Sequence, residues 1–293
     1  VVAFRSVVCA TLYHVGSVLS SGTVSELYGV DLRALIIPRP GKVFMVYDYR
    51  QIEAVILLYL AGDTETLDMV RQGMSIYDAH ARSPRVWTGG ELKKEDKQQY
   101  QFAKARVLGG GYGIGAAKFQ KQFLPGETLE VCAEIVKQYR KANPKIVSRW
   151  KKHDNYVKIS ANDQDDFYSF DLRSGRTMTY YKPRWGESAT AIFGKRILAD
   201  VFRGGKPKSV YGGLITENEV QGTARDVLCA GWRALDKVIP GGVLLTVYDD
   251  FMIEIDEDRV KDAGELAHIL DTAAQEWLPG CPISGDWKIA RRY

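Results

Sequence analysis

Two acidic turns, each attached to an apolar strand, hold the residues best suited to chemistry. Asp48 ends the apolar run 43–47, and Asp249 and Asp250 follow the run 244–247. A carboxylate at the end of a buried strand is costly unless it is paired or binds a cation. If the two strands are neighbours, Asp48 and Asp249 can bridge two Mg²⁺ ions about 3.5 to 4 Å apart, the arrangement used for in-line phosphoryl transfer.

Each turn also has an ordinary structural interpretation. Aspartate is common in hairpin turns, so Asp249 and Asp250 could do no more than shape one. Asp48 could simply cap the helix that follows it. The two turns together favour a shared cation site over two unrelated structural features.

A third element lies between the turns. Lys104, Leu108 and Tyr112 are spaced four residues apart, so they are expected to share one helix face, and residues 109–111 are three glycines that would open space beside it. A lysine near an aromatic ring could hold a triphosphate while the ring stacks on a base. The alternative is a solvated lysine on an amphipathic helix that ends at glycines.

The elements that must position these residues follow from the apolar patterning. Residues 32–62 predict a strand, Asp48 and then a helix that ends at Gly62. From about residue 64 to 203 the pattern is mainly helical, with one short β interruption at 167–181. A helix over 218–235, a strand pair around Asp249 and a helix over 262–277 complete the chain.

Composition limits the class of protein. The 293 residues are 45% hydrophobic and 26% charged, which is typical of a globular chain that buries a sizeable core. No apolar run approaches the roughly 18 residues of a membrane span, and no leader pattern precedes a cleavage site, so we expect a cytoplasmic protein, in the host cytoplasm if the source is viral. The formal charge of +4 is only mildly basic. The four cysteines contain no C-x-x-C pair, which disfavours zinc and a disulfide framework.

The motifs resemble those of family A DNA polymerases, the DNA polymerase I type. Residues 48–54 (DYRQIEA) are similar to motif A, residues 104–113 (KARVLGGGYG) to a phage-like motif B, and residues 247–250 (VYDD) to motif C. Between B and C, residues 174–176 (SGR), 211–213 (YGG) and 217–226 (ENEVQGTARD) resemble further family segments. The order and spacing of these motifs make the resemblance specific.

The resemblance implies a role for each matching residue. The metal ligands would be Asp48, Asp249 and the Tyr49 carbonyl, and Asp250 would join Asp48 and Asp249 in catalysis near the primer end. The deoxynucleotide would be bound by residues of motifs A and B, namely Glu53, Gln51, Lys104, Leu108 and Tyr112. Glu53 would exclude a 2′-hydroxyl, Lys104 would bind the triphosphate and Tyr112 would stack at the template position. The DNA-binding residues would be Arg176, Asn218, Gln221 and Tyr248.

Several positions depart from the family pattern. Tyr100 stands where the family usually has a second phosphate-binding arginine, and we expect Lys97 to compensate because it lies on a similar helix face. Arg50 replaces the common serine of motif A, and Tyr248 and Asp250 replace histidine and glutamate in motif C. Residues 1–31 contain no convincing counterpart of the primer-contacting T-G-R segment.

The resemblance therefore predicts an α+β fold, with a polymerase palm built on an antiparallel β-sheet with packed helices and interrupted by a mainly helical fingers insertion. The palm would comprise 1–63 and 206–293, and the fingers 64–205. The partners would be primer-template DNA and deoxynucleoside triphosphates, with two Mg²⁺ ions as cofactors. The chain starts at Val1 rather than Met, so we expect a part of a longer polypeptide, with the thumb and any exonuclease domain missing.

Two other functions stay open. A single-subunit RNA polymerase or a reverse transcriptase would use the same metal pair. A non-catalytic nucleic-acid-binding palm is the alternative from another class, because Tyr100 and the missing primer-contact segment weaken the case for turnover.

Overall fold

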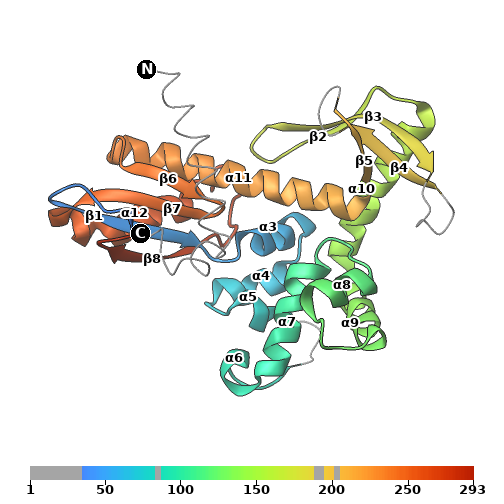
Figure 1. Ribbon diagram of the computed structural model, residues 1–293, viewed down its shortest axis with the longest axis horizontal. Coiled ribbons are helices and arrows are strands. Elements are labelled where there is room, and N and C mark those ends of the chain that lie inside the picture. The colour runs from blue at the N-terminus through green and yellow to red at the C-terminus, as the bar shows by residue number, and fades with distance from the viewer. Residues whose placement is uncertain (1–34, 83–86, 188–194, 201–204) are drawn as a thin grey trace. The chain divides into compact units, whose positions relative to one another are not determined.

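The computed structural model describes residues 35–82, 87–187, 195–200 and 205–293 (Figure 1). These residues form two compact units. The first contains the described residues from 35 to Ile52 together with Arg225–Pro279 and Ile283–Tyr293, and the second contains the described residues of Glu53–Ala224 together with Gly280–Pro282. The expected T-G-R counterpart in residues 1–31 lies outside the described residues.

The first unit is built on a four-stranded antiparallel sheet in the order β6-β7-β1-β8. Its strands are β1 (Lys42–Tyr49), β6 (Val243–Val247), β7 (Asp250–Asp256) and β8 (Gly285–Ala290). β1 is central and is buried along most of its length, as its continuous apolar run predicts. The 3₁₀ turn η2 (Glu257–Asp262) and the helix α12 (Ala263–Thr272) follow β7.

Helix α11 (Gly212–Val238) is the longest in the described chain, and its second half belongs to the first unit. A Cβ atom at Gly231 of this helix would lie 2.8 Å from Leu270 in α12 and 3.0 Å from the Tyr49 hydroxyl. The helix therefore lies close to α12 and β1 because residue 231 has no side chain.

The second unit begins with α3 and continues through a series of helices. Asp63 caps α4 by accepting from the Thr66 N–H, and Asp96 caps α7 by accepting from the Gln98 and Gln99 N–H groups at 3.0 and 2.9 Å. The helices are α3 (Ile52–Ala61), α4 (Thr64–Arg71), α5 (Ile76–Arg82), α6 (Leu92–Glu95), α7 (Lys97–Gly110), α8 (Ala116–Phe123), α9 (Leu129–Ala142) and α10 (Pro144–Asp163).

A second antiparallel sheet follows α10, in the order β2-β3-β4-β5. Its strands are β2 (Phe167–Asp171), β3 (Thr177–Glu187), β4 (Lys195–Asp200) and β5 (Pro207–Val210). The predicted turn at Ser174 and Gly175 joins β2 to β3, but the prediction of one short β interruption was wrong in its extent. The sequence pattern of a strand is interrupted after Tyr181 by Pro183 and Gly186, and Lys182 has a φ of 48° in the structure. This part of β3 is a strand because it pairs with β4, which the sequence pattern did not indicate.

The α+β class predicted from the sequence is confirmed, since both sheets are antiparallel and helices pack against them. No helix among the described residues is long and apolar enough to cross a bilayer.

Candidate active site

The three acidic residues of the two turns lie together at one end of the first sheet. β1 pairs with β7 in a register that sets Asp48 opposite Asp250, and Asp249 lies in the two-residue turn between β6 and β7. One carboxylate oxygen from each of Asp48, Asp249 and Asp250 lies within 4.8 Å of the others. Hard oxygen ligands in this number suit a divalent cation such as Mg²⁺, so the cluster could hold a metal ion.

The negative charges of the three carboxylates repel one another in the absence of a cation. Partial burial raises the pKa of Asp48, and the nearby carboxylates of Asp249 and Asp286 raise it further. Burial also raises the pKa of Asp249. A bound cation would relieve both effects, because it stabilises the ionised carboxylates.

Asp286 is an acidic neighbour that the sequence patterns did not indicate. It lies opposite Asp48 in the pairing of β1 with β8, and it accepts a hydrogen bond of 2.7 Å from Arg50 Nε. The Arg50 hydrogen bond lowers the pKa of Asp286. Arg50, which replaces the family's common serine, thus holds a fourth carboxylate beside the cluster.

The two turns that carry the cluster have unusual backbone geometry. Gln51, in the turn after β1, has φ 41°, and Tyr248, in the turn before β7, has φ 56°. Left-handed φ is uncommon for residues other than glycine, and such residues concentrate at functional sites. Tyr248 is 80% exposed, so its ring is available to a ligand.

The helix α7 carries the predicted nucleotide-binding lysine at its surface. Lys104 is exposed and Leu108 is 46% exposed, so these two residues share an open helix face as predicted. Glu53 is also exposed, near the start of α3. Tyr100, at the usual arginine position, packs edge-to-face on Tyr77 with ring centroids 5.6 Å apart. Tyr100 therefore supports the packing of α5 against α7.

Tyr112 is not on the helix face that its spacing predicted, because α7 ends at Gly110. Tyr112 lies in the turn that follows, and burial together with the charge of Glu53 raises its pKa. A Cβ atom at Gly213, in the first turn of α11, would be closer than 3.0 Å to the Tyr112 carbonyl oxygen. The turn is thus held directly against the start of α11.

The three glycines before Tyr112 do not open a space, which is a second correction. A Cβ atom at Gly109 or Gly110 would lie 2.7 Å from the ring of Phe123 or Tyr139. One at Gly111 would lie 2.7 Å from Leu57 Cδ2. The sequence showed where side chains are missing but not which neighbouring side chains fill the gaps.

The predicted DNA-binding residues of the second unit have contacts within the protein. Arg176 donates to the Gly222 carbonyl at 2.9 Å, and Asn218 donates to the Tyr180 hydroxyl at 2.7 Å. Gln221 is exposed on α11. The first two contacts attach the β2–β3 hairpin to α11, and Arg176 and Gln221 are both exposed.

A buried polar network was missed because its members are far apart in sequence. Arg149 Nε donates to Glu219 at 2.7 Å, and His153 contacts Glu219 at 3.1 Å and the Tyr168 hydroxyl at 2.7 Å. Burial alone would raise the pKa of Glu219, but the hydrogen bonds from His153 and Arg149 outweigh burial and lower it. His153, to which the sequence assigned no role, helps to join α10 to α11.

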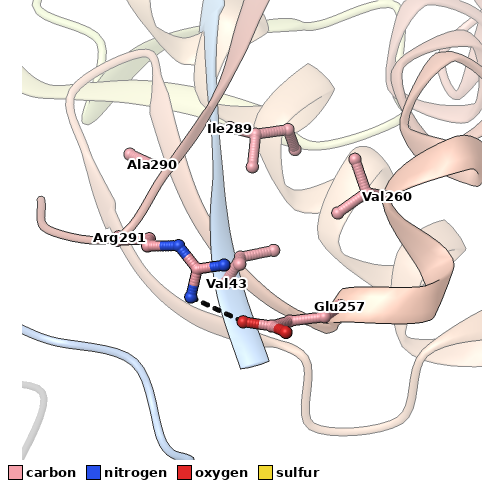
Figure 2. Close-up of a pocket in the computed structure, with 6 residues that line it drawn as sticks. All are labelled: Val43, Glu257, Val260, Ile289, Ala290 and Arg291. Atoms are coloured by element: carbon pink, nitrogen blue, oxygen red, sulfur yellow. Dashed lines mark hydrogen bonds and ion pairs between the residues drawn. The ribbon is translucent and has the colours of Figure 1, made fainter. Parts of the chain in front are cut away.

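A pocket among the described residues lies away from the acidic cluster. It measures about 420 Å³ and is lined by Val43, Glu257, Val260, Ile289, Ala290 and Arg291. Figure 2 shows the ion pair between Arg291 and Glu257, which measures 2.6 Å, at its side. Val43 and Asp48 stand near opposite ends of β1, so this pocket is not part of the carboxylate site.

An antiparallel sheet that presents clustered carboxylates from neighbouring strands defines a candidate metal-dependent enzyme. The family model of DNA polymerase family A matches residues 22–167, about half of the chain. The chain belongs to this family, as its motifs predicted.

Curated relatives agree with this assignment. The chain is 27% identical to a DNA polymerase of Bacillus phage SP02, over 93% of this chain and 44% of the relative. It is 26% identical to DNA polymerase I of Chloroflexus aurantiacus, over 81% of this chain and 23% of the relative. The chain thus spans less than half the length of either relative.

The fold has a solved counterpart. The polymerase domain of Pol1 from M. smegmatis, in complex with DNA primer-template and dNTP, matches with a TM-score of 0.62 and 17% identity, over 89% of this chain and 42% of that one. This likeness supports the polymerase-domain fold.

Proposed function

We propose that this chain carries the nucleotidyl-transfer centre of a template-directed DNA polymerase. The observation that carries the proposal is the convergence of Asp48, Asp249 and Asp250 within 4.8 Å, on paired strands of a family A chain. The reaction adds a deoxynucleotide to a primer 3′-end and releases pyrophosphate. The names of the relatives and the DNA and dNTP in the solved counterpart support these substrates.

The metal-binding role belongs to the acidic cluster in this proposal. Asp48 and Asp249 hold two Mg²⁺ ions, with the Tyr49 carbonyl as a further ligand and Asp250 beside the primer end. When bound, the ions supply charge stabilisation for the attacking and leaving oxygens. The protein contributes the fixed spacing of the carboxylates, because β1 and β7 hold Asp48 opposite Asp250.

The remaining roles follow the family motifs. Lys104 binds the triphosphate, helped by Lys97 because Tyr100 is uncharged, and Gln51 and Leu108 contact the nucleotide. Glu53 excludes a 2′-hydroxyl and Tyr112 lies at the template position. Arg176, Asn218, Gln221 and Tyr248 contact DNA. Residues 1–63 and 206–293 form the palm, and 64–205 form the fingers.

The test is extension of a labelled primer on a DNA template with Mg²⁺ and deoxynucleotides. Asp249→Ala should abolish extension, whereas Asp258→Asn, an exposed acid of η2 outside the cluster, should leave it unchanged. Full extension by Asp249→Ala would refute the proposed metal role.

The same assay separates the alternatives. Efficient extension with ribonucleotides would favour an RNA polymerase, and extension on an RNA template would favour a reverse transcriptase. DNA binding without any extension, at every Mg²⁺ concentration, would favour a non-catalytic module.

A further inference from the structure

The positive charge of the chain is concentrated in the segment that forms the second sheet. Residues 167–210 contain nine lysines and arginines but only three acidic residues, whereas the rest of the chain contains 31 and 33. Outside this segment the chain is slightly acidic. The mild overall charge of +4 therefore conceals one strongly basic element.

Most of these cations are not neutralised within the part of the chain that the structure describes. Arg184 pairs with Asp200 at 3.2 Å, and Arg176 donates to a backbone carbonyl. The other described cations of the sheet are exposed and form no ion pair with described residues, and they are Arg173, Lys182, Lys195, Arg196, Lys206 and Lys208. Such a surface attracts a polyanion.

One face of the sheet β2-β3-β4-β5 packs against the hydrophobic core. Tyr168, Tyr180, Ile197 and Ala199 are buried in a cluster that also contains Val157 of α10. Successive residues of a strand point to opposite faces, so the neighbours of these residues point away from that cluster. The sheet lies in the yellow part of the chain in Figure 1.

The opposite face, which we call the outer face, is defined by Phe167, Tyr181, Arg184 and Arg196. Phe167 and Tyr181 are directly paired across β2 and β3, and Phe167 is 54% exposed. Arg184 lies beyond them on β3, and Arg196 is exposed on β4. Two aromatic rings and two guanidinium groups therefore share one face with Asp200, which lies opposite Tyr181 and pairs with Arg184. Within the described chain, Arg196 is therefore the unneutralised cation of the four residues.

The residue opposite Arg196 on this face is a glycine, and a neighbouring side chain fills its space. Gly186 pairs with Arg196, and a Cβ atom at Gly186 would be closer than 3.0 Å to the side chain of Leu198. Leu198 therefore occupies the space that a side chain at residue 186 would need. The residue that pairs with Arg196 therefore has no side chain, and Leu198 lies beside it on the same face.

We propose that the outer face binds single-stranded DNA. The rings of Phe167 and Tyr181 stack on unpaired bases, and Arg196 and the neighbouring cations contact the phosphates. Duplex DNA would use the cations alone, because its bases are stacked on one another and do not offer a free face to the rings. This binding is separate from the chemistry of the acidic cluster and requires no metal.

Binding of a fluorescent oligothymidylate of about 12 nucleotides to the full chain, in EDTA and at several salt concentrations, tests the proposal. Phe167→Ala should weaken binding about five-fold or more, as expected for loss of one base stack. Arg196→Ala should reduce the slope of log affinity against log salt by about 0.7, the value for one phosphate contact on a single strand.

Matched variants control for unspecific effects. Tyr156→Ala removes an exposed ring from α10, and Lys141→Ala removes an exposed cation from α9, both outside the outer face. Both should bind like the unaltered chain. The proposal is overturned if Phe167→Ala binds as tightly as Tyr156→Ala, or if unlabelled duplex of equal length competes as well as the single strand.

The outcome is independent of the proposed function. Asp249→Asn should lose primer extension but retain oligothymidylate binding. If the unaltered chain does not extend a primer, the nucleotide-transfer proposal fails and the effect of Phe167→Ala on binding can still be measured.

Discussion

Substituting Gly213 by alanine should destabilise the protein more than a glycine-to-alanine change in a helix normally can. Gly213 is the second residue of α11, where alanine would ordinarily favour the helix. Its Cβ atom, however, would be closer than 3.0 Å to the backbone carbonyl of Tyr112. Backbone atoms cannot move aside as a flexible side chain can, so the first turn of α11 or the turn after α7 must shift.

The size of the effect follows from the geometry. Overpacking of this kind usually costs about 1 to 3 kcal/mol, and a clash with backbone belongs at the upper end of that range. The intrinsic gain from alanine is at most about 1 kcal/mol and does not offset it. We therefore expect a net loss of about 2 kcal/mol in the free energy of unfolding.

Urea unfolding measured on two variants tests this prediction. Gly264→Ala is the matched control, because Gly264 is the second residue of α12, has an unremarkable φ and would meet no atom within 4 Å. It should be as stable as the unaltered chain or slightly more stable. Equal stability of Gly213→Ala and Gly264→Ala would refute the close approach of Tyr112 to α11.

Three further predictions concern charged groups. Glu219→Gln should lower the free energy of unfolding, measured in urea, by about 3 kcal/mol, because it leaves Arg149 without its buried charged partner. The same change should remove the part of the pH dependence of stability that Glu219 contributes. The lowered pKa of Glu219 stabilises the folded state above about pH 4.5, and this contribution is lost as the pH falls through the folded-state pKa, so the variant should have a flatter acid limb. Asp249→Asn should raise the melting temperature of the metal-free protein, because it relieves repulsion with Asp48. In the unaltered chain, Mg²⁺ at 100 times its dissociation constant should stabilise the fold by about 2.7 kcal/mol and raise the melting temperature, and Asp249→Asn should abolish this second increase. Arg50→Ser should change the free energy of unfolding by less than about 1 kcal/mol, because its ion pair is exposed, and a larger loss in urea unfolding would contradict this.

Local features of the sequence were predicted well. The strand before Asp48, the helix after it and the hairpin at Asp249 all follow from short apolar runs and turn residues. The meeting of Asp48 with Asp250 depends on pairing between residues about 200 positions apart. No local pattern encodes that register, so the prediction of a shared metal site depended on the assumption that the two strands are neighbours.

The features that the sequence missed depend on side chains from distant segments. The extended second sheet needs β4 to pair with β3, and the role of His153 needs Glu219 from another helix. The three glycines before Tyr112 looked like open space because a sequence shows absent side chains but not the rings that replace them. Each error has the same cause, which is that packing partners are set by the tertiary fold.

The position of the acidic cluster is set largely by residues that carry no charge. Tyr47 and Tyr49 flank Asp48 on β1, and both rings pack edge-to-face with Phe251 of β7, at centroid distances of 6.3 and 6.1 Å. The Tyr47 hydroxyl donates to Asp271, and the Tyr49 hydroxyl donates to the Leu270 carbonyl at 3.1 Å.

Because side chains alternate along a strand, rings fixed on one face of β1 hold Asp48 on the other. A slip of one residue in the pairing would bury the carboxylate and expose both rings, which makes the register costly to change. The aromatic side of β1 therefore stabilises the spacing that the proposed metal site requires. The rings of Tyr47 and Tyr49 thus contribute to the site through packing alone, apart from the Tyr49 carbonyl that is proposed as a metal ligand.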